Sequence, residues 1–356
     1  MSEPNTEHAR PPVNVPRLAI TLLLILAAAA GAYWYGVTSV QPTKVPALWA
    51  LGMDQPSASQ LASQFKDADG NSVADPPADQ TEWLDPPTLN FSYLAADQER
   101  YAATFADVLA FIGERCGKPV QFQPQESPDD QLAGIKSGEL HIVGINSGSV
   151  PIAVYEYGFV PLVSFGADGK LATYTMKIIA RKDSSLEKVS DLRGRRLALT
   201  HPTSNSGWKA PLLLLKNEYQ LTPIVDYDIA STGDHADSIK ALAAGEQEVA
   251  AVASDELLLA EEHGLIKTDD YRVIYESEPF CNNTIGCPHR LKPELVGKVK
   301  QALLEFKWDG SKLADELDTI GAKQFVAVSF KDDYDLLREI EDAMGRRTRE
   351  MLGRQL

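Results

Sequence analysis

The sequence predicts an α/β protein with mostly parallel sheets, divided into two lobes. From Leu89 onward, short apolar runs of strand length alternate with longer runs whose apolar residues recur at helical spacing. Such alternation is typical of α/β folds. It continues over about 270 residues, more than a single sheet comfortably accommodates. Four loops of small polar residues also lie at the ends of predicted elements, where ligands bind in open α/β sheets.

The predicted elements follow from local patterns. Strands are expected at short apolar or alternating runs, over residues 89–94, 120–122, 141–145, 160–163, 174–180, 196–200, 248–252 and 271–275. Helices are expected over residues 101–116, 130–136, 150–157, 208–218, 236–244 and 255–262. The first of these helices has one apolar face, formed by Tyr101, Phe105, Val108, Leu109 and Ile112. Gly117 ends that helix, and mostly helical sequence follows residue 275.

Composition restricts the classes of partner. The chain has 356 residues, of which 44% are hydrophobic, enough for substantial cores. Its formal net charge of −16 disfavours nucleic acids and anionic membrane surfaces as partners. The six histidines show no spacing typical of metal ligands, and the three cysteines are too few for a disulfide-dense scaffold. We therefore expect no metal and no cofactor.

An apolar segment near the N-terminus is long enough to cross a bilayer. It spans residues 18–37 without a charged side chain, follows Arg10 and Arg17, and ends near an aromatic cluster. We expect residues 1–17 in the cytoplasm, a transmembrane anchor at 18–37 in the inner membrane and a periplasmic, or otherwise extracytoplasmic, remainder. A cleaved signal peptide is the alternative, because the small residues at 28–32 fit a cleavage site.

Residues 38–87 are expected to form a hydrated linker. Prolines punctuate this segment, with Ser, Asp and Gln between them. Residues 67–71 resemble the start of a calcium-binding loop, but Gly70 comes too early and no glutamate closes the loop. The pattern therefore favours a tether and not a metal site.

The loop at residues 200–208 is the most informative part of the chain. Between a predicted strand and a predicted helix it carries small donors, namely Thr203, Ser204, Asn205 and Ser206. A helix N-terminus has unpaired N–H groups and carries about half a positive charge. Small side chains leave these groups open, and Gly207 gives a ligand access to the backbone. The loop therefore suits a tetrahedral oxyanion such as phosphate, and an ordinary N-cap at Ser204 or Ser206 is the alternative.

Three further loops have equivalent positions. Asn146 and Ser147 follow one predicted strand and offer more donors, His235 ends a polar loop before a helix, and Asp255 follows another strand. Taken singly, these loops also fit a turn, an N-cap formed by Asp234 and a solvated acid in a first helical turn. Four such loops in one chain favour a shared ligand site.

At this point the order of segments resembles the phosphate- and phosphonate-type substrate-binding proteins of ABC importers, which have the type II periplasmic binding protein fold. The resemblance covers about residues 89–345 and rests on three stretches: KSGELHIVGINSGS, MKIIARKDSSLEKVSDLRGRRLALTHPTSNSGW and STGDHADSIKALAAGEQEVAAVASDEL. It implies a binding protein that delivers a small phosphorus oxyanion to a permease in the inner membrane.

The expected lobes are discontinuous in sequence. The first comprises residues 88–170 and 286–356, and the second comprises residues 171–285. We expect the chain to cross between them near residues 167–171 and again near 276–286, and closure of the lobes to bury the ligand.

The resemblance also implies a role for each candidate residue. Ser204, Asn205 and Ser206 would hold the oxyanion, with Asn205 replacing a hydroxyl that is usual in the family. His235 would touch the oxyanion from the second lobe. Asp255 lies where aminophosphonate binders place an acid for the ligand's ammonium group.

Two departures from the family pattern bear on the ligand. Pro128 or a neighbour stands where the family has a tyrosine of the first lobe. Asn282 or Asn283 stands where it has another acid. These departures disfavour an aminophosphonate and leave phosphate, phosphite or a phosphonate with an uncharged tail.

Two alternatives to a transport role come from the sequence. The stretches 185–188 and 206–209 both match S-x-x-K, a pattern of serine acyl-enzymes, but the companion motifs of those enzymes are absent. We therefore expect no catalysis. A sensor that signals to a membrane partner is the other alternative, although the chain contains no kinase or methyl-accepting region.

The cysteines provide one further expectation. Cys281 and Cys287 flank a possible turn in an exported domain, which predicts a disulfide between them. Two independent buried thiols are the alternative, because a disulfide needs Cα atoms within about 7 Å. Cys116 is expected to be unpaired.

Overall fold

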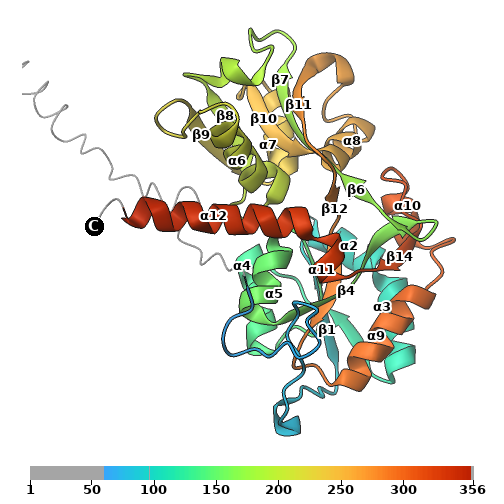
Figure 1. Cartoon of the computed structure of the whole chain (residues 1–356). Coiled ribbons are helices and arrows are strands. Elements are labelled where there is room, and N and C mark those ends of the chain that lie inside the picture. The colour runs from blue at the N-terminus through green and yellow to red at the C-terminus, as the bar shows by residue number, and fades with distance from the viewer. Residues whose placement is uncertain (1–59, 96, 354–356) are drawn as a thin grey trace, which may run out of the picture. The chain divides into compact units, whose positions relative to one another are not determined.

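The computed structural model describes residues 60–95 and 97–353, in which two β-sheets with helices on their faces form two lobes (Figure 1). The strands are β1 (Leu89–Tyr93), β2 (Val120–Phe122), β3 (Ile142–Ile145), β4 (Phe159–Ala167), β5 (Lys170–Leu171), β6 (Thr173–Tyr174), β7 (Met176–Arg181), β8 (Arg196–Thr200), β9 (Asp228–Gly233), β10 (Val249–Ala253), β11 (Tyr271–Glu276), β12 (Phe280–Cys281), β13 (Thr284–Pro288) and β14 (Gln324–Ala327). The α-helices are α2 (Gln98–Thr104), α3 (Ala106–Cys116), α4 (Pro128–Ser137), α5 (Val150–Tyr157), α6 (Ala210–Asn217), α7 (His235–Ala243), α8 (Ser254–Glu262), α9 (Pro293–Glu305), α10 (Lys312–Leu317), α11 (Phe330–Asp333) and α12 (Asp335–Gly353). Shorter helical turns are η2 (Gln80–Glu82), η3 (Ser147–Ser149), η4 (Val189–Leu192), η5 (Asn205–Lys209) and η6 (Thr268–Asp270).

The first lobe contains a seven-stranded sheet in the order β14-β4-β13-β3-β1-β2, with β5 paired to β4. Helices α3 and α9 pack against each other, and their buried apolar side chains form one core with those of β1, β4 and β13. Helix α4 contacts β3, and α5 contacts β4. Helix α4 begins at a Ser127 cap with Pro128 in its first turn and ends at Gly138, whose φ of 82° favours glycine.

The second lobe contains a five-stranded sheet in the order β11-β7-β10-β8-β9. Helices α7 and α8 contact β10, and η5 also contacts β10, while α6 contacts β7. Every residue of β10 is buried, and in β8 only Arg196 is exposed. Near-continuous apolar sequence is what a strand covered by helices on both sides requires.

Both sheets are mixed, so the prediction of mostly parallel sheets was wrong. Strand β1 is parallel to β2 and β3, and β8 is parallel to β9 and β10. Strand β13 is antiparallel to β3 and β4, and β7 is antiparallel to β10 and β11. Strands β14 and β5 are also antiparallel to their neighbour β4.

The two crossovers lie at residues 172–175 and 277–283, between the last strand of one sheet and the first strand of the other. Within them, β6 and β12 pair as a short antiparallel ladder, Phe280 opposite Tyr174 and Cys281 opposite Thr173. The first crossover begins after residue 171 because residues 170–171 form β5, which turns back onto β4.

Residues 60–87, the described part of the expected linker, lie against the first lobe. The Ala62 N–H donates to the Tyr155 carbonyl at 2.9 Å, and the Phe65 ring meets His289 edge-on at 4.9 Å. Leu84 forms a β-bridge with Leu291. The tether prediction therefore fails for this part, because its scattered apolar residues find partners on the lobe surface that proline content alone does not reveal.

The predicted disulfide between Cys281 and Cys287 was wrong. All three cysteines are free and buried. Cys281 lies in the β12 ladder, whereas Cys287 lies in β13 in the core of the first lobe. An extended chain between the two residues keeps them apart, and burial raises the pKa of both thiols.

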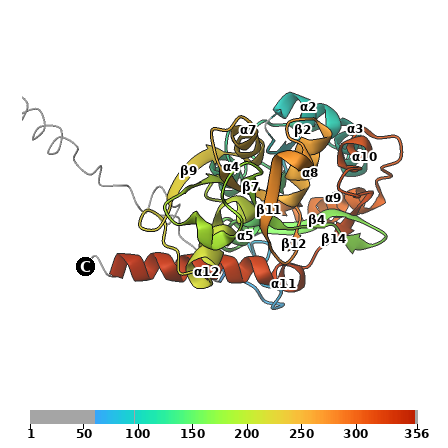
Figure 2. The same cartoon turned by 90° about the horizontal axis from the view of Figure 1, so that it is seen from above.

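The C-terminal helix α12 lies beside both lobes (Figures 1 and 2). It contacts α5 and η3 of the first lobe, and α6 and η5 of the second. Among the described residues, no helix combines the length and the apolar character needed to span a membrane. The expected anchor at residues 18–37, its flanking segment 1–17 and the first part of the linker lie outside those residues.

Candidate ligand-binding site

A cavity of about 870 Å³ lies between the two lobes, at the ends of β1, β3, β8, β9 and β10. All eight predicted site residues line it: Asn146, Ser147, Thr203, Ser204, Asn205, Ser206, His235 and Asp255. Sequence reasoning therefore found residues that the fold brings together.

The loop after β8 leads directly into a helical turn, η5, which has π-helical geometry and continues into α6. Ser204 is its N-cap, because the Ser204 Oγ accepts a hydrogen bond from the Gly207 N–H at 3.1 Å. Asn205 and Ser206 follow in the first turn, where backbone N–H groups have no acceptor within the helix. The loop therefore contains an N-cap and also offers donors to a ligand. An N-cap at Ser204 and an oxyanion site in the same loop are thus compatible.

Gly207 has a different role from the one predicted. A Cβ at this position would lie 2.1 Å from Thr200 Oγ1 and 2.9 Å from His235 Cε1. The space beside Gly207 is thus filled by protein side chains and not left for a ligand. The glycine allows β8 and α7 to bring Thr200 and His235 against the turn.

Asn205 carries the clearest sign of a missing partner. The residue is 2% exposed, yet neither its amide oxygen nor its amide nitrogen has a hydrogen bond of normal geometry in the protein. Its side chain lies near the Tyr174 hydroxyl and partly offsets the rise that burial causes in the pKa of that phenol, so this longer contact is the one protein interaction of the amide among the described residues. The hydroxyl of Thr200, 1% exposed, is also unpartnered. Buried polar atoms are almost always hydrogen-bonded, so such groups beside a cavity indicate a ligand or ordered water.

His235 is held as a neutral donor that points at the loop. Its Nδ1 accepts a hydrogen bond from the Ala253 N–H at 3.2 Å, which leaves the proton on Nε2. Nε2 lies 3.3 Å from Ser204 Oγ and can donate to it. Burial lowers the pKa of His235 to about 4, so the ring is uncharged near neutral pH. Since Ser204 Oγ accepts from both His235 and Gly207, its own proton is free to point into the cavity.

Two carboxyl groups follow β10 at the opposite side of the site. Both oxygens of Asp255 already accept hydrogen bonds, one from the Glu256 N–H and one from the Asn282 side chain, each at 3.0 Å. Burial raises the pKa of Asp255. Glu256 is exposed to the cavity, and enclosure by the lobes, with the nearby Asp255 and Asp234 carboxylates, raises its pKa as well.

The first lobe contributes a second polar loop. The Asn146 side chain accepts from the Ser149 N–H at 3.0 Å and so caps η3, which places Ser147 in the cavity wall. The Ser147 hydroxyl hydrogen-bonds to the Tyr174 hydroxyl. Burial raises the pKa of Tyr174 to about 12, so this phenol remains protonated.

Several cavity residues were not predicted from the sequence. Tyr174 comes from the first crossover, and Asn283 from the second, where its side chain donates to the Tyr93 hydroxyl at 2.7 Å. Glu256 and Thr200 also line the cavity. Glu256 adjoins the predicted Asp255, and Thr200 ends β8 where the predicted ligand loop begins, so both had an available signal. The family resemblance pointed to residues 282–283 only as the position of a missing acid, and Tyr174 had no signal, because only the folded lobes bring it to the cavity.

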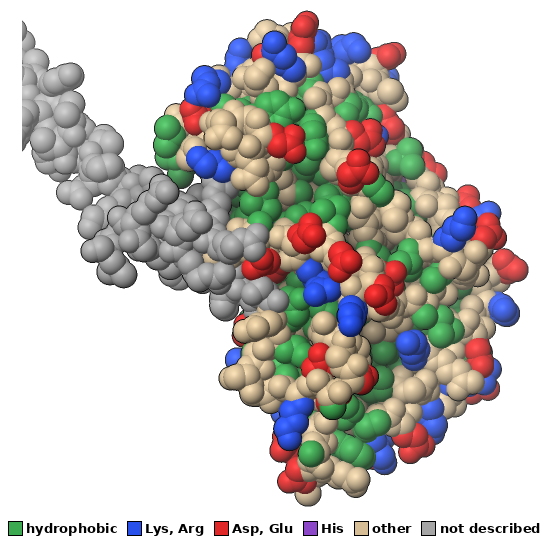
Figure 3. Space-filling model, in the orientation of Figure 1, with side chains coloured by type: hydrophobic (Ala, Val, Ile, Leu, Met, Phe, Trp, Pro, Cys, Tyr) green, Lys and Arg blue, Asp and Glu red, His purple; other side chains and the backbone are tan. Residues whose placement is uncertain are grey.

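The charge of the cavity wall is one-sided. Among its described lining residues there is no lysine or arginine, and four are acidic: Glu126, Asp234, Asp255 and Glu256. On the face of the molecule in Figure 3, by contrast, acidic and basic side chains are mixed over both lobes. An anion held here must therefore rely on neutral hydrogen-bond donors and the helix N-terminus.

The S-x-x-K interpretation is not supported by the geometry. The Lys209 Nζ lies 2.5 Å from a Glu341 oxygen and donates to the Gly148 carbonyl at 2.8 Å. The Lys209 side chain is thus engaged by Glu341 and the Gly148 carbonyl, and among the described residues no hydrogen bond joins it to Ser206, as a serine base would require.

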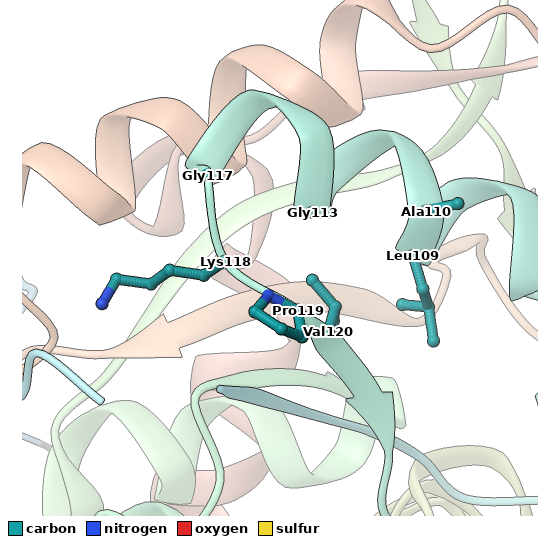
Figure 4. A pocket seen from close by; sticks show the side chains of 7 residues that line it. All are labelled: Leu109, Ala110, Gly113, Gly117, Lys118, Pro119 and Val120. Carbon is teal, nitrogen blue, oxygen red and sulfur yellow. The ribbon is translucent and has the colours of Figure 1, made fainter. Parts of the chain in front are cut away.

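A second hollow lies on the first lobe, where α3 turns into β2 (Figure 4). It is lined by Leu109, Ala110, Gly113, Gly117, Lys118, Pro119 and Val120. The charged group of Lys118 is already paired with Asp85 at 2.9 Å. This hollow has no converging polar groups, so it does not compete with the interlobe cavity.

Comparisons with known proteins agree with this arrangement. The model of a family described as periplasmic phosphonate substrate-binding proteins of ABC transporters matches residues 92–334. PhnD1 of Prochlorococcus marinus in complex with methylphosphonate has a TM-score of 0.63 at 15% identity, covering 74% of this chain and 100% of that chain. A chloride-bound protein of Xanthomonas citri has a TM-score of 0.62 at 16% identity, with coverages of 75% and 100%. A binding protein component of an ABC phosphonate transporter from Pseudomonas aeruginosa has a TM-score of 0.61 at 16% identity, with coverages of 76% and 97%. At these identities the solved structures share the two-lobed fold with this chain.

Proposed function

Because the chain belongs to the periplasmic phosphonate substrate-binding family of ABC transporters, we propose that it holds a phosphorus oxyanion in the interlobe cavity and delivers it to a membrane permease. The oxyanion lies against the turn at the start of η5, where Ser204, Asn205 and Ser206 provide donors. His235 fixes the orientation of Ser204, and Asn146 and Ser147 complete the wall from the first lobe.

The buried side chain of Asn205 is the observation that carries this proposal. Neither of its amide atoms has a hydrogen bond of normal geometry, beyond a longer contact with the Tyr174 hydroxyl, and both lie at a helix N-terminus beside the cavity. A phosphoryl oxygen accepts from the amide nitrogen, and a protonated oxygen of the same group donates to the amide oxygen. A monoprotonated phosphorus oxyanion thus satisfies both atoms at once, which a fully ionised sulfate does not.

The acidic wall supports a phosphonate whose organic part carries a positive charge. The Glu256 carboxylate has no hydrogen bond or ion pair among the described residues, whereas both oxygens of Asp255 are engaged. A ligand ammonium group beside Glu256 would offset the negative charge of the cavity. This revises the sequence-based preference for an uncharged tail, which rested on the missing acid at residues 282–283.

Isothermal titration calorimetry with five ligands tests the proposal: phosphate, phosphite, methylphosphonate, 2-aminoethylphosphonate and sulfate. We expect each phosphorus oxyanion to bind more tightly than sulfate. We expect 2-aminoethylphosphonate to bind more tightly than methylphosphonate, by about 10- to 100-fold for a hydrogen bond between charged groups. If none of the phosphorus compounds binds, the proposed function is wrong.

The role of Glu256 is tested separately. Glu256→Gln should abolish the preference for the amine and leave methylphosphonate affinity nearly unchanged. Glu262→Gln is the matched control, because Glu262 lies at the other end of α8 and does not line the cavity. Equal affinities for both phosphonates in the unmodified protein would reject the ammonium contact and leave the oxyanion site intact.

We further propose that residues 18–37 anchor the protein in the inner membrane, since this segment is long and uncharged. Membrane fractionation of the full chain and of a variant that starts after the segment, exported with an unrelated cleavable signal, tests this. The full chain should be found with membranes and the shortened chain in the soluble periplasmic fraction. A mature N-terminus found at residues 28–32 would instead show a cleaved signal peptide.

A further inference from the structure

A buried ion pair lies behind the oxyanion turn. Lys209 is 7% exposed and Glu341 is 4% exposed, and their charged atoms are 2.5 Å apart. The Lys209 Nζ also donates to the Gly148 carbonyl at 2.8 Å. Lys209 is the last residue of η5, Gly148 lies in η3, and Glu341 lies in α12. One ammonium group thus joins the ligand loop of each lobe to the C-terminal helix.

The two loops also meet backbone to backbone at this point. A Cβ on Gly148 would lie 2.3 Å from the Thr203 carbonyl oxygen and 2.4 Å from the Asn205 nitrogen. The glycine therefore allows the first-lobe loop to lie directly on the second-lobe loop. Residues on either side of these contacts line the cavity, so the spacing of the loops determines the spacing of the ligand donors.

Burial of this pair needs a specific geometry. A lysine and a glutamate removed from water are stabilised only if each finds well-placed partners, and apolar residues of similar size often give equal or greater stability. Stability alone therefore does not account for a charged pair here. Unlike an apolar side chain, the Lys209 ammonium group can donate a hydrogen bond to the Gly148 carbonyl.

We propose that Lys209 and Glu341 are positioning residues, which hold the two ligand loops in register and link them to α12. Glu341 fixes the Lys209 side chain, and Lys209 in turn fixes Gly148 against residues 203–205. Separation of the loops breaks the Lys209 contact to Gly148, so the pair favours the closed arrangement. The effect on affinity rests on the proposed function, whereas the effect on the loops does not.

The test compares a charge-removing variant with an apolar pair. Glu341→Gln should weaken methylphosphonate binding by about 5- to 150-fold, the usual range of coupling between sites. It should also speed amide hydrogen exchange in residues 146–149 and 203–209 of the ligand-free protein. Lys209→Met combined with Glu341→Leu should restore the melting temperature yet keep the weak binding and fast exchange, because no donor holds Gly148. Glu305→Gln is the control, since it removes a surface ion pair with Arg115.

Wild-type affinity and wild-type exchange in the double variant would overturn the proposal, because the pair would then be purely structural. The double variant keeps the test decisive if Glu341→Gln alone fails to fold. If the unmodified protein does not bind methylphosphonate, this compound is not a ligand and the proposed function is weakened. The hydrogen-exchange measurement on the ligand-free protein still tests the role of Lys209 and Glu341.

Discussion

Asn205 shows how a single residue can separate a ligand role from a structural one. Asn205→Ala removes a buried donor and a buried acceptor that have no hydrogen bond of normal geometry in the protein. We expect the melting temperature of the ligand-free protein to change little, because only the longer contact with the Tyr174 hydroxyl is lost. Affinity for methylphosphonate should fall by about 1.5–3 kcal/mol, the usual contribution of a hydrogen bond to a charged group. Calorimetry and thermal unfolding of the same samples measure both effects.

Asn146→Ala is the matched control for that prediction. The Asn146 side chain caps η3 through the Ser149 N–H, so its removal should destabilise the ligand-free protein by about 0.5–2 kcal/mol. A stability loss in Asn205→Ala as large as that in Asn146→Ala would show that Asn205 has a structural partner after all.

His235 predicts a specific pH dependence of stability. Its pKa in the folded protein is about 4, below the value of about 6.5 for an unfolded histidine. Below pH 6.5 the unfolded chain therefore binds a proton that the folded chain does not, and stability falls between pH 6.5 and about 4. His235→Asn can retain the contact to Ala253 but does not titrate there. Its melting temperature should fall less than that of the unmodified protein between pH 7 and 5.

A parallel fall in the two proteins over that range would contradict the neutral state assigned to His235. The carboxyl groups of Asp255 and Glu256 are common to both proteins, so their titration cancels in the comparison. Melting curves at a fixed salt concentration provide the measurement.

The site residues that could be predicted are those whose chemistry is local. Ser204 to Ser206 are recognisable because small donors follow a strand and begin a helix, and both features are visible within ten residues of sequence. Tyr174 and Asn283 could not be found in this way, since the crossovers bring them to the cavity from separate parts of the chain. The disulfide prediction failed for the same reason: the spacing of the cysteines does not reveal that Cys281 lies in β12 and Cys287 in β13.

At the level of elements, the contact between η3 and η5 predicts that a methyl group added at Gly148 weakens ligand binding. Gly148→Ala places a Cβ within 2.4 Å of backbone atoms of Thr203 and Asn205, which cannot rotate away. The loops must then separate, so we expect methylphosphonate affinity to fall by at least about tenfold, through faster dissociation. Stopped-flow kinetics would measure the dissociation rate.

Gly297→Ala is the control substitution for Gly148→Ala. Gly297 lies within α9, and a Cβ there meets nothing within 4 Å. It should stabilise the protein by about 0.5–1 kcal/mol and leave binding unchanged. Normal binding by Gly148→Ala would mean that the two loops are not in contact when ligand is bound.

The elements that could be predicted are those with strong local periodicity. Strands β2 and β8 have the predicted bounds, because each is a short apolar run between clear breaks. Strand β9 was missed: it lies at the edge of its sheet, with mostly exposed or half-buried residues, so its sequence reads as a polar loop. The long predicted strand at 174–180 is divided between β6 and β7, since residue 175 lies in the crossover.

At the level of the whole molecule, the family and the two-lobed fold were predicted correctly from the order of segments. The mixed sheets were not, because strand direction depends on where the chain crosses between lobes. The packing of residues 60–87 on the first lobe was also missed. Its contacts involve single apolar residues such as Leu84 and Phe65, too sparse to give a periodic signal.

The net charge of −16 and the absence of lysine and arginine from the described cavity wall predict an unusual salt dependence. An approaching phosphonate is repelled by the protein as a whole, and salt screens that repulsion over a Debye length of about 10 Å at 0.1 M. Raising sodium chloride from about 10 mM to about 200 mM should therefore increase the association rate of methylphosphonate, by about two- to tenfold. A site built on lysine or arginine would show the opposite trend.

The matched ligand for this experiment is 2-aminoethylphosphonate, whose ammonium group offsets one negative charge. Its association rate should rise less with salt, because the net repulsion is smaller. Stopped-flow measurements of both ligands on the same protein sample provide the comparison. If the methylphosphonate rate fell as salt was added, positive charge would have to lie on the ligand's path into the cavity. In the proposed site the anion is held at short range by neutral donors and the start of η5, so salt should change the dissociation rate far less than the association rate.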